Sequence, residues 1–176
     1  MTQEKLYKMV PQNGFLLQDT GRDLAKIAVF ERHKGTGSCA VGFVTGFGFT
    51  SGAVASTVAH DSHNLLIVGT NDKDMAFAGN VLADCGGGMV AVADGKVLAL
   101  VELPLAGLMS DRPVEDVAQA VAALAEAWKT LGCTLVSPFM TMALLSLPVI
   151  PALRLTNRGL VDVNSFSFVD LIVETK

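Results

Sequence analysis

The sequence predicts an α+β fold, a single compact domain in which a mostly antiparallel or mixed sheet of about six to eight strands packs with two main helices. Short apolar runs, rich in β-branched and small residues, alternate with glycine-containing turns, which is typical of strands and hairpins. Asp94-Gly95 stands between two such runs and is a strong signal for a type I′ turn. Because few stretches show the helical period, hairpins are expected to outnumber β-α-β crossovers.

The strands are assigned from the apolar runs in chain order. Residues 1–24 are polar and broken by Pro11 and Asn13-Gly14, so we expect an arm or linker there, with the domain proper over residues 25–176. The predicted strands lie at residues 25–31, 39–44, 53–59, 65–69, 89–93, 96–102 and 166–173.

The first helix is predicted from its capping residues. Asn71 is a favourable N-cap, and Asp72 and Asp74 stand in the first turn, where the helix dipole favours carboxylates. The glycines at residues 86–88 are expected to end this helix, because glycine readily adopts the backbone conformation that follows a helix.

The second helix is predicted from periodicity. Ser110 and Asp111 offer caps, and Pro113 is expected in the first turn. Apolar residues then recur at spacings of four, three, four and three, which makes one stripe facing a core: Val117, Val121, Leu124, Trp128 and Leu131. Residues 139–147 are expected to form a short apolar helix or a buried segment.

Composition limits the classes of partner. The formal net charge is −4 and no run of Lys and Arg is longer than a pair, so nucleic acid is not an expected partner. Hydrophobic residues make up 51% of the chain and charged residues 17%. This balance leaves two explanations open: a large core rich in Ala, Val and Leu, or a surface covered by a partner or another domain.

Cysteine usage and hydropathy bear on the compartment. The three cysteines are far apart and form no CxxC pair, so reduced, buried thiols and a cytoplasmic location are expected. Residues 1–10 are charged and lack the apolar core of a signal peptide. Residues 35–59 and 131–153 carry no charge, but glycines interrupt the first stretch and prolines the second. Both are interpreted as buried core, and no membrane contact is expected.

The three histidines are the main candidates for chemistry near neutral pH. His60 and His63 follow an apolar run, with Asp61 between them. Two histidines could share a metal ion if a third ligand came from elsewhere in the chain. The interpretation we prefer is structural: one imidazole orients the loop through hydrogen bonds and the other packs at an interface. No metal site is therefore predicted, and His60 and His63 are the only weak candidates.

A second polar cluster ends the first predicted strand. Strand alternation places Glu31 and His33 on one face and Arg32 on the other. A carboxylate beside an imidazole could serve as a base or as a purine contact. The alternative is a polar strand end with a surface ion pair, which contributes little to stability.

Sequence motifs for nucleotide binding and for serine hydrolysis are either absent or stand in the wrong structural context. Gly35-x-Gly37-x-x-Ala40 resembles a dinucleotide-binding loop, but a strand-like segment follows it where a helix is required. Neither a Walker sequence nor a Gly-x-Ser-x-Gly elbow is present. Ser110-Asp111 is interpreted as a helix cap and not as a catalytic pair. Nucleotide-cofactor and serine-hydrolase functions are therefore excluded.

Five segments carry a resemblance to a known family. They are residues 31–37 (ERHKGTG), 54–64 (VASTVAHDSHN), 69–72 (GTND), 106–111 (AGLMSD) and 138–141 (PFMT). On these segments the chain resembles the C-terminal domain of adenine deaminase, and the resemblance runs over residues 26–174.

The resemblance implies a reaction whose catalytic part is absent from this chain. In adenine deaminases, which belong to the amidohydrolase superfamily, a metal-bound hydroxide attacks C6 of adenine, and adenine and water become hypoxanthine and ammonia. The resemblance places the metal, manganese, iron or zinc, in a (β/α)₈ barrel that precedes this domain. With three histidines and no His-x-His strand end, this chain cannot supply that ligand set. We therefore expect no cofactor and no catalytic residue in it.

The expected role is that of an accessory C-terminal domain that supports active-site closure or oligomerisation and is inactive alone. Its expected partners are a catalytic barrel, in the same or a separate chain, and copies of itself. The residues expected to contact the substrate or the barrel are Glu31, Arg32, His33, His60, Asp61 and His63. Two alternatives stay open: a stand-alone module that binds a purine or another small ligand, and a docking or oligomerisation module.

Overall fold

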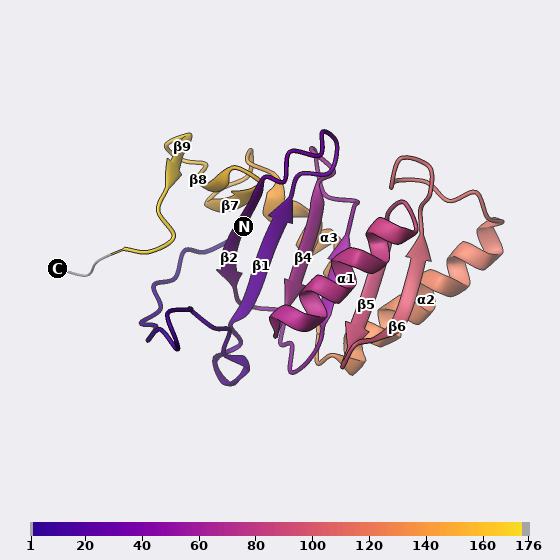
Figure 1. The fold of residues 1–176 in the computed structure, drawn as a ribbon, viewed down its shortest axis with the longest axis horizontal. Helices are drawn as coiled ribbons and strands as arrows, with labels where there is room; N and C mark the ends of the chain where they lie inside the picture. The colour runs from indigo at the N-terminus through magenta and orange to yellow at the C-terminus, as the bar shows by residue number, and fades with distance from the viewer. Residues whose placement is uncertain (1, 174–176) are drawn as a thin grey trace.

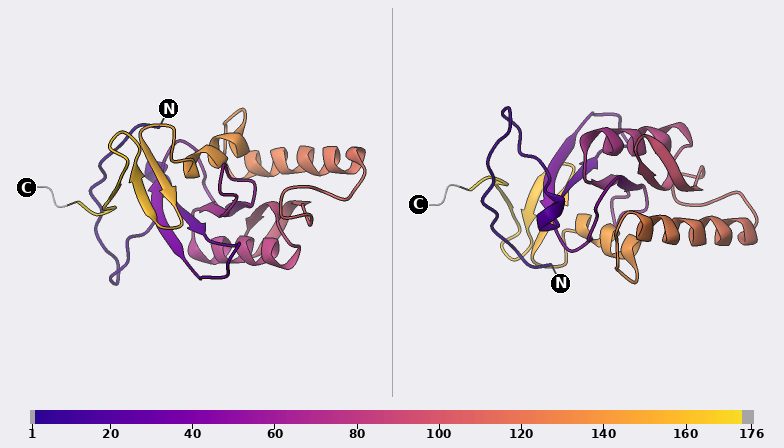
Figure 2. Two further views of the ribbon diagram at one scale, coloured as in Figure 1. Left: turned by 90° about the horizontal axis from the view of Figure 1, so that it is seen from above. Right: turned by 90° about the horizontal axis from the view of Figure 1, so that it is seen from below.

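The computed structural model describes residues 2–173 and has three layers (Figure 1). A six-stranded sheet forms the middle layer. Helix α1 (Asp72–Asp84) packs on one face, while α2 (Val114–Thr130), α3 (Pro138–Ala143) and a small sheet cover the other (Figure 2). Within residues 2–173, no helix is both long and apolar enough to cross a membrane.

Both sheets are antiparallel. The large sheet has the order β2-β1-β4-β3-β5-β6 and the small one β7-β8-β9. The strands are β1 (Ala25–Phe30), β2 (Cys39–Val44), β3 (Ala53–Ser56), β4 (Leu65–Gly69), β5 (Gly88–Ala93), β6 (Lys96–Glu102), β7 (Leu153–Thr156), β8 (Gly159–Asp162) and β9 (Ser167–Val169). The predicted α+β class is confirmed, with the strands divided between two sheets.

Each face of the large sheet has its own core. On β1, Ile27 and Val29 point to the core shared with α2, whereas Ala28 points to the core beneath α1. Every residue of β3 is buried, because this strand lies inside the sheet with helices on both sides. The largest buried side chain is that of Trp128, which contacts Phe49 at a ring separation of 5.2 Å.

Local signals were sufficient for the first helix and for the hairpin. The side chain of Asn71 accepts a hydrogen bond from the Asp74 N–H at 2.8 Å, so the predicted N-cap is confirmed. Asp94 and Gly95 have φ values of 51° and 69°, which confirms the type I′ turn. The buried carboxylate of Asp74 also accepts a hydrogen bond from the Gly95 N–H at 2.9 Å and so ties this hairpin to α1.

The predicted cap of the second helix is wrong. α2 begins at Val114, and Pro113 occupies the N-cap position in an extended conformation without a side-chain cap. A residue before proline avoids the helical region, so Arg112 cannot extend the helix back to Ser110. The Ser110 hydroxyl accepts a hydrogen bond from the Arg112 N–H at 3.2 Å instead, and Asp111 is exposed.

The predicted apolar stripe is buried only in the second half of α2. Leu124 and Trp128 are buried, and so is Leu131 just beyond the helix, whereas Val121 is 45% exposed. The reason is that the first turns of α2 lie at the rim of the molecule, where the helix runs out along β6 (Figure 2).

Three strands are shorter than predicted. β1 ends at Phe30, one residue before the predicted end. β3 ends at Ser56, because the Ser56 hydroxyl accepts a hydrogen bond from the Val58 N–H at 3.0 Å and turns the chain. β9 covers only Ser167–Val169 of the predicted 166–173. The predicted short apolar helix is present as α3, followed by a 3-10 turn at Leu144–Ser146.

The segment before β1 is mostly extended chain. It contains one 3-10 turn, Thr20–Arg22, and it exposes several large apolar side chains, among them Leu6, Val10 and Phe15. Leu24, by contrast, is buried directly before β1. The exposed apolar groups are available to a partner, because the arm has no core of its own.

Candidate functional site

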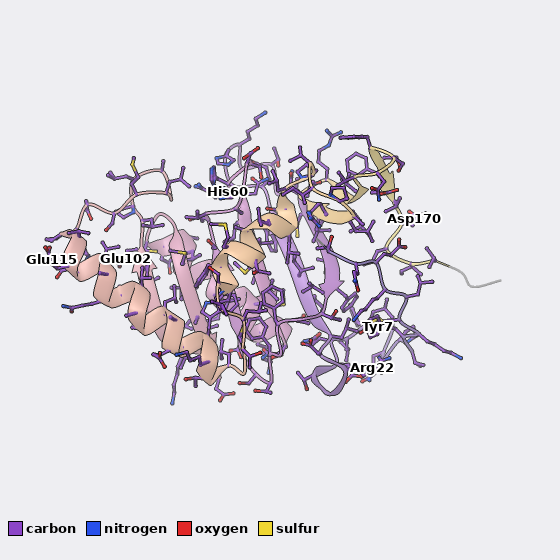
Figure 3. All side chains as sticks on the ribbon, turned by 180° about the vertical axis from the view of Figure 1, so that it is seen from behind. Tyr7, Arg22, His60, Glu102, Glu115 and Asp170 are labelled. Carbon is purple, nitrogen blue, oxygen red and sulfur yellow. The ribbon has the colours of Figure 1, made fainter. Side chains whose placement is uncertain are left out.

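Three loops meet at one edge of the large sheet, the upper edge in Figure 1, and Figure 3 shows His60 there. We call this the histidine edge and define it as residues 31–38, 57–64 and 103–109. The strand registers explain the meeting, because the chain enters or leaves each strand at this edge. The paired residues are Phe30 with Leu65, Ser56 with Met89, and Gly88 with Glu102. The structure thus brings both predicted clusters together.

Glu31 organises the turn after β1. Its Oε1 atom accepts hydrogen bonds from the backbone N–H groups of His33 at 2.5 Å and Lys34 at 2.7 Å. Its Oε2 atom accepts from the N–H of Thr36 at 3.1 Å and from the Thr36 hydroxyl at 3.0 Å. These donors, the Thr36 N–H first, outweigh burial and lower the pKa of the Glu31 carboxyl to about 2. The carboxylate is committed to the turn and is a poor general base.

We expect the Glu31 carboxyl to titrate near pH 2 in a ¹³C NMR titration. Because the folded pKa lies below the ordinary 4.5, the carboxylate stabilises the fold fully above pH 4.5 and loses this effect as the pH falls through about 2. Thr36→Val removes the hydroxyl that donates to Glu31 and accepts from the Ser38 N–H, and it should move the midpoint upward. A midpoint near 4.5 in the native chain would contradict the turn described above.

Arg32 and His33 connect the two predicted clusters. The Nε of Arg32 donates a hydrogen bond to the carbonyl oxygen of His63 at 2.6 Å, and its Nη2 donates to that of Ala106 at 2.8 Å. The Nε2 of His33 lies 2.7 Å from the carbonyl oxygen of Ser62 and donates to it in the Nε2–H tautomer. The side chain of His33 therefore bonds the second cluster and not Glu31.

His63 orients its own loop. Its backbone N–H donates to the carbonyl oxygen of Ala59 at 2.7 Å, and its Nδ1 accepts from the Ala59 N–H at 3.3 Å. Burial, with the neighbouring positive charge of Arg32 and the His60 ring, lowers the pKa of the His63 imidazole. A lowered pKa keeps Nδ1 free to accept this hydrogen bond at neutral pH.

His60 and Asp61 stand in the turn of this loop. Asp61 is exposed and His60 is half-buried, with its ring edge-on to that of His63 at a separation of 5.7 Å. The carbonyl oxygen of His60 lies 3.4 Å from the Ser146 hydroxyl, which anchors the backbone beneath the ring. In this turn, Asp61 and its exposed neighbour Ser62 are therefore more available for contact with another molecule than His60.

The two weak metal candidates lack a third ligand. In the part of the chain that the structure describes, residues 2–173, no group of three or more His, Cys, Asp and Glu side chains is close enough to hold a metal ion. His60 and His63 lie side by side, but the Nδ1 of His63 is occupied by the Ala59 N–H.

A hollow of about 460 Å³ opens beside the edge, between the turn after β1 and the β7–β8 turn. Within it, Asn64 donates to the Oδ1 of Asn157 at 3.2 Å, and the Nδ2 of Asn157 donates to the Ser38 hydroxyl at 3.1 Å. The buried Oδ1 of Asn64 has no hydrogen-bond partner among residues 2–173. The lining is polar: Glu31, His33, Lys34, Thr36, Ser38, Asn64 and Asn157.

The third loop, residues 103–109, was not predicted to be part of the edge. This loop reaches Arg32 through the carbonyl oxygen of Ala106. The available signal was the segment 106–111, one of the five that carry the resemblance. Its neighbours could not be inferred, because they depend on where β5 and β6 pair in the sheet.

The fold and the edge define a class of protein: an α+β domain in which three loops of an antiparallel sheet present a histidine-bearing edge. Compared with known families, residues 1–167 match the family described as the adenine deaminase C-terminal domain. The chain therefore belongs to the adenine deaminase C-terminal domain family, and the predicted resemblance is confirmed.

Curated relatives agree with this assignment. The chain is 75% identical over 150 residues to an adenine deaminase of Moorella thermoacetica, a match that covers 85% of this chain and 25% of the relative. It is 63% identical over 156 residues to an adenine deaminase of Clostridium botulinum, covering 89% of this chain and 26% of the relative. It is 53% identical over 163 residues to an adenine deaminase of Desulfatibacillum aliphaticivorans, covering 93% of this chain and 29% of the relative. The chain thus spans about a quarter of the length of these relatives.

Proposed function

We propose that this chain acts as the accessory C-terminal domain of an adenine deaminase, in which adenine and water give hypoxanthine and ammonia. In this role it helps to close or position the active site, or to assemble the oligomer, and it is inactive by itself. The family match supports the proposal, as does the short span of the chain within its adenine deaminase relatives.

The observation that carries the proposal is the convergence of the two polar clusters on the histidine edge. Glu31, Arg32, His33 and His63 hold the loops together by hydrogen bonds. On the loop that they fix, Asp61 is exposed and His60 is half-buried. When a loop is already ordered, binding of a partner does not include the loss of conformational entropy that ordering the loop would require.

The proposed partner is a catalytic barrel, in the same or a separate chain, that carries the manganese, iron or zinc. The residues of this chain do not fit such a metal, because no cluster of three ligands is present within residues 2–173. No catalytic step is therefore assigned to them. We also propose self-association in the cytoplasm, which would cover exposed apolar side chains such as Leu6, Val10 and Phe15.

Replacement of His60 or Asp61 tests the proposed role. We expect His60→Ala and Asp61→Asn, made in an intact adenine deaminase that carries the same two residues at the equivalent positions, to lower kcat by about tenfold, because the loop would no longer position the active site correctly. Ammonia release measures the activity. Thermal unfolding should change little, since surface substitutions typically stay within about 0.5 kcal/mol.

Lys73→Ala is the matched control. Lys73 is exposed in the first turn of α1, at the opposite edge of the sheet, and its loss should leave kcat unchanged. A lower melting temperature with normal kcat in the His60 and Asp61 variants would refute the proposed role.

A purine-binding module is the second candidate, and the hollow beside the edge favours it. The unpartnered Oδ1 of Asn64 is an acceptor of the kind that an amino group of a purine satisfies. If this chain binds adenine by itself, its melting temperature should rise with the logarithm of the adenine concentration once that concentration exceeds the dissociation constant. An accessory domain without a ligand site of its own should show no such increase.

A further inference from the structure

The segment 106–111 has no role in the proposed function, yet it lies beside the histidines. Its loop closes on itself, since the Leu105 N–H donates to the carbonyl oxygen of Met109 at 3.1 Å and the Met109 N–H donates to that of Leu105 at 3.2 Å. Leu105 is 49% exposed and Met109 is 61% exposed. The loop thus presents apolar side chains at the same edge as the loop that carries His60 and Asp61.

The guanidinium of Arg32 joins this loop to the histidine loop. Nε and Nη2 donate to two carbonyl oxygens from different loops, those of His63 and Ala106. Neither of these partners is a carboxylate, and among residues 2–173 Arg32 forms no ion pair. Its charge therefore strengthens two hydrogen bonds to the backbone.

Gly107 lets the guanidinium lie against the backbone. Gly107 has φ of +72°, and a Cβ atom added to it would lie 2.9 Å from both Nη1 and Nη2 of Arg32. On the other side, the buried Thr57 hydroxyl donates to the carbonyl oxygen of Gly107 at 2.7 Å and accepts from the Gly88 N–H at 2.8 Å. The third loop is consequently held both by Arg32 and by the end of β3.

We infer that Arg32 is a positioning residue: its guanidinium, seated on Gly107, locks residues 57–64 and 103–109 into one rigid surface. The inference builds on the proposed function, because the locked surface is the one proposed to meet the barrel. It assigns the segment 106–111 to that surface and changes the role of Arg32 from a contact residue to an internal support.

Geometry makes arginine necessary at this position. A guanidinium is a planar fork whose nitrogens can reach two carbonyl oxygens at once. A lysine ammonium is a single point, so Arg32→Lys keeps the charge but can hold only one of the two loops. Gly107→Ala acts on the same contact from the other side, because its methyl group displaces the guanidinium.

Amide hydrogen exchange of this chain, resolved by NMR, tests the inference. In Arg32→Lys and in Gly107→Ala, we expect the His63 and Met109 amides to exchange about tenfold faster, because the two loops open together. Amides of β4, such as that of Ile67, should keep their protection. The double variant should exchange no faster than the more affected single variant, since both substitutions break one contact.

Arg112→Lys is the matched control. Arg112 is an exposed arginine just beyond the same loop, paired with Glu102 at 2.9 Å, and its replacement should leave both amides unchanged. The inference is overturned if Arg32→Lys speeds exchange at His63 alone, or if it raises exchange equally in the loops and in β4. The first result would mean that the loops are independent, and the second that Arg32 serves only global stability.

The same substitutions in an intact adenine deaminase that carries an arginine and a glycine at the equivalent positions separate this inference from the proposed function. If both loops open together in this chain and kcat of the intact enzyme falls, both are supported. If the loops open together but kcat and KM stay unchanged, Arg32 is a positioning residue and the proposed role of the edge fails. If kcat falls without any change in loop exchange, the positioning role is refuted.

Discussion

Trp128→Ala should destabilise this domain by about 3–5 kcal/mol, as expected when a large buried aromatic side chain is removed. Trp128 is 1% exposed and lies at the centre of an aromatic cluster in which its ring is 5.2 Å from that of Phe49 and 4.6 Å from that of Phe139. The ring joins α2, the segment before β3, and α3 into one core. Its removal leaves a cavity that these three elements can close only by moving.

Urea unfolding followed by far-ultraviolet circular dichroism measures this effect. Fluorescence is unsuitable, because Trp128 is the only tryptophan. Trp128→Phe should cost much less, since its indole N–H has no hydrogen-bond partner among residues 2–173 and ring packing is partly kept. Val121→Ala, at a half-exposed site on the same helix, should stay within about 0.5 kcal/mol. A similar loss for Trp128→Ala and Val121→Ala would contradict the central position of Trp128.

Gly88→Ala should destabilise the domain by about 2–5 kcal/mol, the sum of backbone strain and forced contact. Gly88 begins β5 with φ of +151°, and a Cβ atom there would overlap the carbonyl oxygen of Val101 on β6. The neighbouring strand cannot withdraw without breaking the ladder between Gly88 and Glu102. For a chain of this size, the melting temperature should fall by on the order of 10 °C.

Gly95→Ala separates strain from contact. Gly95 also has a positive φ, +69°, but a Cβ atom there would meet nothing within 4 Å. This variant should cost about 1–2 kcal/mol, the penalty of a left-handed conformation alone. If the two alanine variants melt at the same temperature, the close approach of Val101 to Gly88 contributes nothing and the prediction fails. Because the Gly88 N–H donates to Thr57, Gly88→Ala should also loosen the histidine edge.

Much of the candidate site was accessible from the sequence, because its residues lie at strand ends. The segments 31–37 and 54–64 each follow an apolar run, and strand ends collect at sheet edges. What could not be predicted is how each side chain is used. The carboxylate of Glu31 accepts hydrogen bonds from N–H groups of its own turn, and the ring of His33 forms a hydrogen bond with the carbonyl oxygen of Ser62. Those partners depend on backbone conformations that no periodicity specifies.

Residue patterns alone were enough to predict the α+β class, the Asn71 cap, the Asp94-Gly95 turn and the family resemblance. The cap and the turn rest on interactions between residues only a few positions apart, and the class and the resemblance rest on patterns of residue types along the chain, so none of them requires knowledge of long-range contacts. The start of α2 was predicted less well, because Pro113 places it at Val114 and not at the predicted cap, Ser110.

Which loops meet at the histidine edge depends on contacts between distant parts of the chain. Arg32 and Ala106 are separated by 74 positions in the chain, and they meet because β1 pairs with β4, β4 with β3, β3 with β5, and β5 with β6. Each pairing sets a register that the next one inherits. The contact between Arg32 and the third loop is therefore a property of the whole sheet and of no single segment.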